Sequence, residues 1–254
     1  MIDFHTHILP KVDDGSKNEK MTMNMLEKLS LQDVDTICAT SHYIPDEYEI
    51  TREKYDLTFN GIKSLNSKIN IVTGLELYIS PDLIKQYENK KIWGINDTNY
   101  LLIELPMDFF PIYAEDLFYN LKALGLNPII AHPERNSKII DDVDLLINLV
   151  NQGTLVQMNS GSLIGEYGSL IKKFAEKLVS MNLVHVLGSD AHNDSSRPPR
   201  LKEGFDILHK MNPDLYQWIL ENEKLIISGD EVNNIPEIYI KKQTFFGKLF
   251  NNKK

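Results

Sequence analysis

Seven short apolar runs rich in β-branched residues recur along the chain and alternate with stretches whose apolar residues follow helical spacing. The predicted strands are residues 2–7, 35–42, 69–77, 100–105, 127–132, 154–159 and 183–190. The predicted helices between them are residues 18–31, 52–65, 81–89, 113–124, 143–151 and 170–181. Such alternation is typical of parallel strands joined by right-handed crossovers and covered by helices. We therefore expect an α/β fold, arranged either as an open doubly wound sheet or as a barrel.

The ends of the predicted helices carry capping signals. Ser16 is placed to cap the first helix, and Gly125 and Gly153 follow the fourth and fifth helices as C-terminal caps. No change in composition divides the first 230 residues, so we expect one domain over residues 1–235. Residues 236–254 form a predicted tail that ends in the basic and aromatic stretch KKQTFFGKLFNNKK. This tail either binds anionic lipid or a partner protein at its surface, or it is a solvated terminus.

Charge and cysteine content exclude several classes of function. The 254 residues include 36 acidic and 27 basic side chains, giving a formal charge of -9, and a surface of that sign repels nucleic-acid backbones. Cys38 is the single cysteine and forms no intramolecular disulfide. The first residues lack the basic start and apolar run of a signal peptide, and no apolar stretch reaches the roughly 18 residues of a membrane span. We expect a cytoplasmic protein.

Six of the seven predicted strands end in, or are followed by, side chains that bind metal ions. These residues are His5, His7, His42, Glu76, Glu104, His132, Asp190 and His192. The carboxyl ends of parallel strands share one face of a sheet or barrel, so residues spread over almost the whole chain meet there. His5 and His7, two positions apart on a strand, point to the same side. The sequence therefore predicts a metal centre at this face. His185, inside a predicted strand, and His209, inside a predicted helix, are interpreted as structural.

The kinds of donor indicate which ions are bound and what they do. Imidazole and carboxylate without thiolate favour zinc, manganese or iron, and more than four ligands require more than one ion. Either Asp13 or Asp14, in the loop after the first strand, can join His42 and His192 as a ligand. A carboxylate such as Glu76 can bridge two ions, and a water between them becomes hydroxide near neutral pH. The sequence therefore predicts a hydrolase.

The arginines suggest which bond is attacked. Only four of the 27 basic residues are arginines, and Arg135, Arg197 and Arg200 all follow predicted ligands. The planar guanidinium suits bidentate contact with phosphate oxygens, which predicts a phosphoester substrate bound by Arg135 and Arg197. A cysteine-nucleophile phosphatase is excluded because Cys38 lacks an arginine six positions later. There is also no phosphate-binding P-loop and no GxSxG elbow.

The segments FHTHILPKVDDGS, ATSHY, TGLEL, IELP, AHPERN and GSDAH together resemble the polymerase and histidinol phosphatase (PHP) family. The resemblance extends from the first residue to about residue 230 and is closest to the CpsB/CapC branch, the manganese-dependent protein-tyrosine phosphatases of capsule and exopolysaccharide loci. It implies a distorted (β/α)7 barrel with three Mn2+ ions. It also implies a role in polysaccharide synthesis, with the phosphorylated tail of a bacterial tyrosine kinase as substrate.

The resemblance also distributes the ligands. It assigns His5, His7, Glu76 and Asp190 to one ion, and Glu76, Glu104 and His132 to a second. It places Asp14, His42 and His192 on the third, and so favours Asp14 over Asp13. We take Arg135, Arg197, Asp190 and His192 as the candidate catalytic residues.

Three alternatives share much of this pattern. A PHP phosphatase acting on histidinol phosphate or a similar metabolite would have the same ligands, although the runs DDGS and HPERN favour the protein-tyrosine reading. A catalytically idle, metal-stabilised module that binds the kinase is a second alternative. An amidohydrolase barrel also begins with an HxH pair, but usually needs a bridging lysine where this chain has Glu104.

Overall fold

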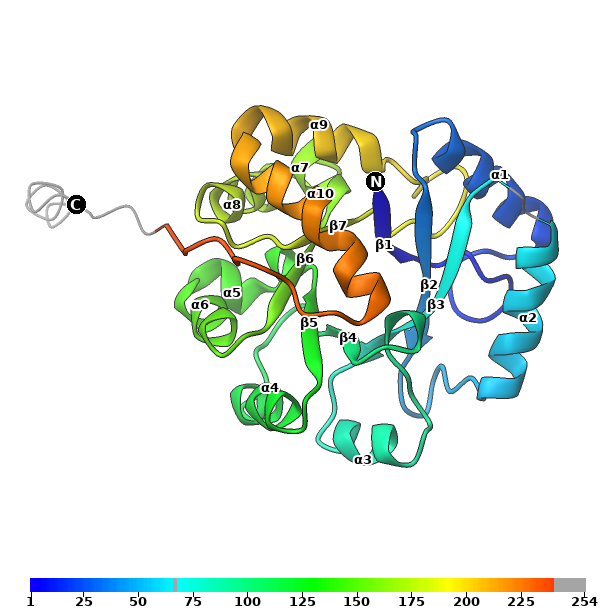
Figure 1. Ribbon diagram of the computed structural model, residues 1–254, viewed down its shortest axis with the longest axis horizontal. Helices are drawn as coiled ribbons and strands as arrows, with labels where there is room; N and C mark the ends of the chain where they lie inside the picture. The colour runs from blue at the N-terminus through cyan, green and yellow to red at the C-terminus, as the bar shows by residue number, and fades with distance from the viewer. Residues whose placement is uncertain (66–67, 240–254) are drawn as a thin grey trace, which may run out of the picture.

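Seven parallel strands form a nearly closed barrel in the computed structural model, which describes residues 1–65 and 68–239 (Figure 1). The strands pair in chain order: β1 (Ile2–Thr6), β2 (Thr36–Tyr43), β3 (Asn70–Tyr78), β4 (Tyr100–Glu104), β5 (Asn127–Ala131), β6 (Leu155–Asn159) and β7 (Val186–Gly188). All seven predicted strands are confirmed. The barrel, and not the open doubly wound sheet, is therefore the arrangement that this chain adopts.

The barrel closes between its first strand and the segment after its last. Thr6 forms a parallel bridge with Ala191, and the amide of His7 donates to the Ala191 carbonyl at 2.9 Å. The amide of Asp190 donates to the His5 carbonyl at 2.8 Å. The two ends of the sheet therefore meet at residues 5–7 and 190–192.

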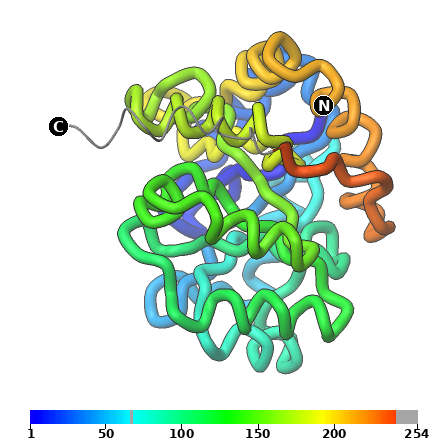
Figure 2. The backbone as a smooth tube through the Cα atoms, turned by 90° about the vertical axis from the view of Figure 1, so that its left-hand side faces the viewer, coloured from blue at the N-terminus to red at the C-terminus, as the bar shows by residue number. Residues whose placement is uncertain are grey.

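Helices surround the barrel (Figure 2). Six of them occupy the predicted stretches: α1 (Glu19–Ser30), α2 (Arg52–Leu65), α3 (Leu83–Glu88), α4 (Ala114–Ala123), α6 (Asp144–Asn151) and α8 (Ser169–Ser180). The helix predicted around His209 is α9 (Leu201–Met211). The sequence analysis missed α5 (Ser137–Asp141), α7 (Ser160–Ile164), α10 (Pro213–Ser228) and the short 3-10 helices η1 (Ile95–Asp97) and η2 (Pro133–Arg135). None of the helices in the described ranges is long and apolar enough to cross a membrane.

The same side of several strands is apolar at its start and polar at its end. Residues an even number of positions apart on one strand share a face. Four strands show this pattern: Cys38 and His42 on β2, Val72 and Glu76 on β3, Leu102 and Glu104 on β4, and Leu155 and Gln157 on β6. Cys38, Val72, Leu102 and Leu155 belong to one buried apolar cluster, which Ile226 of α10 joins. This smaller of the two apolar clusters among the described residues thus fills the amino-terminal half of the barrel interior and leaves the carboxyl ends of the strands to polar side chains.

The helix ends correct one prediction and confirm two. Asn18, and not Ser16, caps α1, because its side chain accepts a hydrogen bond from the Met21 amide. Ser16 is buried and hydrogen-bonds Thr22 instead, at 2.8 Å. Gly125 and Gly153 follow α4 and α6 with positive φ values of 78° and 92°, as expected of glycines that end helices.

The chain beyond α10 runs back along the barrel. Asn182 donates a hydrogen bond to the Glu237 carbonyl at 2.9 Å, and the Tyr239 amide donates to the Met181 carbonyl at 3.0 Å. Of the predicted tail, only residues 236–239 are described, and its basic and aromatic stretch at residues 241–254 lies outside the described residues. The proposed division of the chain at residue 235 stays a prediction.

Candidate metal centre

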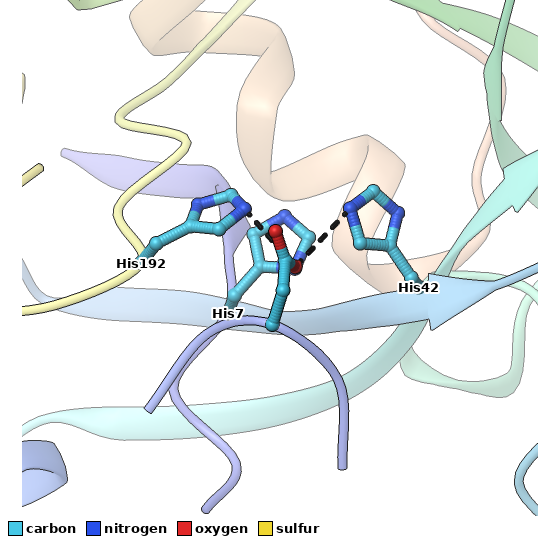
Figure 3. Close-up of side chains that lie close together, drawn as sticks. His7, His42 and His192 are labelled. Carbon is cyan, nitrogen blue, oxygen red and sulfur yellow. Dashed lines mark ion pairs between the residues drawn. The ribbon is translucent and has the colours of Figure 1, made fainter. Parts of the chain in front are cut away.

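Nine histidine and acidic side chains converge at the carboxyl ends of the strands. They are all nine of the predicted ligands: His5, His7, Asp14, His42, Glu76, Glu104, His132, Asp190 and His192. Every one belongs to at least one group whose donor atoms lie within 4.8 Å of one another. Figure 3 shows three of the imidazoles, those of His7, His42 and His192, around one carboxylate. That carboxylate is Asp14, whose Oδ1 lies 3.5 Å from His42 Nε2 and 3.4 Å from His192 Nε2.

Glu76 lies at the centre of the cluster. Its Oε1 is 2.9 Å from His132 Nε2, and its Oε2 is 3.0 Å from both His5 Nε2 and His42 Nδ1. Oε2 is buried, yet it forms no hydrogen bond with any described residue. Although burial raises its pKa, the imidazoles of His5 and His42 hold the pKa of Glu76 well below its usual range. One carboxylate that faces four imidazoles, those of His5, His7, His42 and His132, has the surroundings expected of a ligand shared by two metal ions.

Glu104 is a buried carboxyl group close to two other carboxylates, so its charged form is disfavoured. Burial, together with the negative charges of Glu76 and Asp190, raises the pKa of Glu104 to about 9. A divalent ion between such carboxylates would remove this repulsion.

The spacing of the donors also fits metal ions. Two ligands about 2.1 Å from an octahedral ion, at right angles, lie about 3.0 Å apart. The contacts around Glu76 Oε2 are 3.0 Å to His5 and His42 and 3.3 Å to His7. The donor set therefore fits a site for more than one divalent ion.

The groups of donors overlap with the sets predicted for three ions but are not identical to them. The groups are His7, Asp14, His42 and His192; His5, His7 and Asp190; His5, Glu76 and His132; and His42, Glu76 and Glu104. The predicted set of Asp14, His42 and His192 is kept together and is joined by His7. Glu104 and His132, predicted to share an ion, fall in different groups that both contain Glu76. The assignment of each ligand to an ion stays a prediction.

The two adjacent aspartates of the first loop take different positions. Asp13 Oδ2 accepts from His7 Nδ1 at 2.8 Å and from the His42 amide at 2.9 Å, so its carboxylate is occupied in holding these two histidines. Asp14 faces His42 and His192 directly. This arrangement supports Asp14 as the ligand and gives Asp13 an orienting role, which the sequence analysis missed. Carboxylates that hold the second nitrogen of a metal-binding imidazole are common in metalloproteins.

Two of the arginines lie at the edge of the cluster. Arg135 Nη1 is 3.0 Å and Arg197 Nη2 is 2.9 Å from the same atom, Asp190 Oδ2. The Arg135 guanidinium carbon also lies 4.6 Å from the centre of the Tyr167 ring, in a cation–π contact. Both arginine side chains are partly exposed, at 22% and 36%. They can therefore meet a ligand from solvent beside the predicted metal centre.

The other two arginines have different partners. They form ion pairs at the surface: Arg52 with Asp56 and Asp97, and Arg200 with Glu166 and Glu203. Arg200, which the sequence analysis placed near the ligands, is thus engaged elsewhere.

The two histidines interpreted as structural lie outside the donor groups. His185, immediately before β7, accepts a hydrogen bond from the Val156 amide at 2.9 Å through Nδ1. Burial lowers the pKa of His185 to about 4. His209, on α9, stacks on Tyr216 with ring centres 4.3 Å apart.

Several buried polar residues next to the cluster were not predicted. Glu134 Oε1 accepts from the Asn159 amide at 2.9 Å and from Ser162 Oγ at 2.6 Å, and burial raises the pKa of Glu134 to about 7. Gln157 and Asn159 end β6, the one strand without a predicted ligand. Their only signal in the sequence is that two amide side chains stand at alternate positions at the end of an apolar run.

The chain is similar to several known proteins. The family model described as capsular polysaccharide synthesis, CpsB/CapC, matches residues 1–228. CapC of Staphylococcus aureus is 38% identical over 256 residues, covering 98% of this chain and 100% of that protein. The tyrosine-protein phosphatase YwqE of Bacillus subtilis (strain 168) is 35% identical, covering 97% of this chain and 99% of YwqE.

A solved structure is similar over the whole barrel. It comes from the crystal structures of YwqE from Bacillus subtilis and CpsB from Streptococcus pneumoniae, described as unique metal-dependent tyrosine phosphatases. The matched chain is 34% identical with a TM-score of 0.86, and the match covers 95% of this chain and 100% of the other.

Proposed function

This chain belongs to the CpsB/CapC family of capsular polysaccharide synthesis, and from that premise we propose that it is a metal-dependent phosphatase that hydrolyses phosphotyrosine in proteins. One observation of this chain carries the proposal beyond its relatives. Asp190 belongs to the cluster of nine metal-competent side chains and also contacts two partly exposed arginines, Arg135 and Arg197. Cations on one side and guanidinium groups on the other are what a transferring phosphoryl group needs.

The ligands of the ions are proposed as the sequence predicts them, with Glu76 shared between two ions. Three Mn2+ ions are proposed, because the donors are imidazole and carboxylate without thiolate and because the family match covers the whole cluster. When bound, such ions acidify a coordinated water and neutralise charge on the phosphoryl oxygens. Buried His5, His7, Glu76 and Asp190 exclude bulk water from the side of the site that faces the barrel.

Arg135 and Arg197 are proposed to bind the phosphoryl group. Each can donate to oxygens of the substrate while keeping a contact with Asp190, because a guanidinium group has five N–H donors. Charge on the equatorial oxygens grows in the transition state, where directed donors stabilise it most. A phenolate leaving group, with a pKa of about 10, departs more readily than the alkoxide of serine. The same site would therefore hydrolyse phosphotyrosine faster than phosphoserine.

The proposed physiological substrate is the phosphorylated tail of a bacterial tyrosine kinase, and the proposed role is control of capsular or exopolysaccharide synthesis. The support is the family to which the chain belongs, together with close relatives that are tyrosine-protein phosphatases. The cytoplasm is the proposed location, because a kinase that uses ATP makes its product there. A phosphatase of small metabolites and an idle kinase-binding module remain the competing functions.

One comparison of substrates separates these functions. The full chain is stripped of metal, reconstituted with Mn2+ and supplied with a phosphotyrosine peptide, the matching phosphoserine peptide and histidinol phosphate. The proposal expects Mn2+-dependent release of phosphate with kcat/KM highest for the phosphotyrosine peptide. Preference for histidinol phosphate would favour the metabolite phosphatase. Mn2+ binding without hydrolysis of any of the three would favour the idle module.

A further inference from the structure

Strand β6 is the exception among the seven strands. Its carboxyl end carries two amides, Gln157 and Asn159, where the other strands contribute histidine or acidic residues. Both side chains are fully buried and point to the same side, because they are two positions apart. Gln157 Oε1 lies 2.9 Å from His5 Nδ1, and Gln157 Nε2 donates to Asn159 Oδ1 at 2.9 Å. Asn159 Nδ2 then donates to Asp190 Oδ2 at 2.8 Å.

These contacts form one chain of hydrogen bonds from His5 to Asp190, and its direction is determined from the Asp190 end. The Asp190 oxygen already accepts from Arg135 and Arg197, so it acts as an acceptor and Asn159 must turn its amino group towards it. The Asn159 oxygen then has to face Gln157, which must donate. The remaining atom of the Gln157 amide, its oxygen, has to face His5.

A second group determines the same direction from the other end. The backbone amide of His132 donates to Gln157 Oε1 at 3.3 Å. A backbone N–H is always a donor, so the Gln157 atom that faces both His132 and His5 must be the oxygen. Asp190 at one end and the His132 amide at the other therefore require the same orientation of both side-chain amides. This orientation follows from the neighbours alone and does not depend on how the amide nitrogen and oxygen were assigned.

The direction of these hydrogen bonds determines which atoms of His5 and Asp190 remain available to metal ions. Because Gln157 Oε1 is an acceptor, His5 carries its proton on Nδ1 and keeps the Nε2 lone pair free. His5 Nε2 faces His7 Nε2 at 3.1 Å and Glu76 Oε2 at 3.0 Å. At the other end, Asp190 Oδ2 accepts from three donors, which leaves Oδ1 to face His7 Nε2 at 3.5 Å and His192 Nδ1 at 3.4 Å.

A glycine in β7 leaves room for this series of hydrogen bonds. A side chain at Gly188 would place its Cβ 2.4 Å from the Cβ of His5 and 2.9 Å from Gln157 Nε2. A Cβ atom is essentially never found that close to another heavy atom, so glycine at position 188 lets His5 and Gln157 pack together as they do.

We propose that Gln157 and Asn159 are positioning residues. They form an amide relay that fixes the tautomer of His5 and the orientations of His5 and Asp190, so that both residues can bind the same metal ion. Amides suit this task because they orient both ligands without adding negative charge beside Glu76, Glu104 and Asp190. The relay rests on the proposed metal-dependent function, but none of the predicted ligand or substrate-binding roles is assigned to Gln157 or Asn159.

Metal affinity tests the relay. Gln157→Met and Asn159→Leu keep similar volumes and remove the amide groups. Titration of metal-stripped full-length protein with Mn2+ in a calorimeter should show affinity about 10- to 100-fold weaker for each variant, as for other residues that orient metal ligands. Gln217→Met, on the exposed face of α10, makes the same chemical change away from the site and should keep the parental affinity.

A double variant tests whether the two amides act as one unit. If they form a relay, Gln157→Met combined with Asn159→Leu should lose little more affinity than the weaker-binding single variant, since either change already interrupts the chain. Losses that multiply would show two independent contacts and would overturn the relay.

A spectroscopic measurement on the unaltered protein does not depend on whether the variants fold. In Zn2+-loaded, 15N-histidine-labelled protein, NMR should find the His5 proton on Nδ1, at a chemical shift typical of a hydrogen bond to an acceptor. A proton on Nε2 would overturn the relay.

Failure of the relay differs from failure of the proposed function. Parental Mn2+ affinity in both single variants, with the unaltered enzyme active on phosphotyrosine, would overturn only the relay. An unaltered protein that neither binds Mn2+ nor hydrolyses phosphotyrosine would overturn both.

Discussion

Arg197 Nη2 lies 2.9 Å from Asp190 Oδ2, so a residue proposed to bind phosphate is held by a residue proposed to bind metal. Arg135 contacts the same oxygen at 3.0 Å. Because Asp190 is buried and the arginines are partly exposed, the carboxylate fixes the inner end of each guanidinium group and leaves other N–H groups free. Placement of the phosphoryl group is thereby tied to the geometry of the metal centre.

The first prediction concerns these two arginines. Arg135→Lys and Arg197→Lys keep the charge but lose the bidentate geometry, so each should lower kcat/KM by roughly ten- to a thousandfold while metal content stays at the parental level. Steady-state kinetics with metal analysis measures both quantities. Arg52→Lys and Arg200→Lys, at surface ion pairs, are the matched controls and should change kcat/KM little. Activity within about twofold of the parent in both site variants would contradict the phosphate-binding role.

The second prediction concerns the shared carboxylate. Glu76→Gln removes one of the two oxygens that face four imidazoles and removes the negative charge, so it should lower the number of bound Mn2+ ions and abolish most turnover. Metal analysis of the reconstituted variant measures the loss. His209→Gln changes a histidine that stacks on Tyr216 outside the cluster and should keep both metal and activity. A fully active Glu76→Gln protein would refute the multinuclear site.

The third prediction uses two glycines that differ in the space around them. Gly188→Ala forces a methyl group against His5, so it should destabilise the protein by about 1–3 kcal/mol and weaken Mn2+ binding. Gly61→Ala, on α2, meets no described atom within 4 Å and should raise stability by about 0.5–1 kcal/mol, since alanine favours helix. Denaturant unfolding and Mn2+ titration measure the two effects. A neutral Gly188→Ala variant would show that this packing is not tight.

The fourth prediction concerns Glu223, which is buried against the start of β1 and accepts a hydrogen bond from the Ile2 amide at 3.1 Å. Burial raises its pKa to about 7 from an ordinary value of 4.5. The unfolded chain therefore loses this proton at lower pH than the folded chain, and folding stability falls as pH rises from 4.5 to 7.

Glu223→Gln removes this pH dependence and keeps an oxygen for the Ile2 amide. Its gain in the free energy of unfolding over the parent should grow by roughly 2 kcal/mol between pH 5 and pH 7.5. Urea unfolding at both pH values, with metal saturation matched, measures the difference. An equal gain at the two pH values would mean that Glu223 ionises at its ordinary pKa in the folded protein.

The strand ends were predictable because backbone geometry leaves few alternatives. Parallel strands bring their carboxyl ends together, so His42, Glu76 and Glu104 could be placed in one cluster from their positions in apolar runs. The choice between Asp13 and Asp14 could not be made from position alone, because it depends on which carboxylate reaches His7 across the loop.

Other features lacked a local signal. Gln157 and Asn159 are neutral amides that occur in many settings, and only their contacts with His5 and Asp190 reveal a role. Ser16 satisfies the residue preference for a helix cap but is drawn into the turn that its amide closes on the His7 carbonyl, so α1 begins later, after Asn18. The helix α10 follows the last strand, where the alternation that guided the sequence analysis has ended and only a helix around His209 was expected.

The closure of the barrel between residues 5–7 and 190–192 also constrains when the site can form during synthesis. A growing chain that has passed β6 still lacks Asp190 and His192, while His5 and His7 have been exposed to solution since the start. The contacts of His5 and His7 with Asp190 span more than 180 residues, and contacts between such distant positions slow folding. Under the proposed ligand set, a chain that ends before residue 190 lacks two of the nine metal ligands, so tight metal binding has to wait until the last strand of the barrel has been translated.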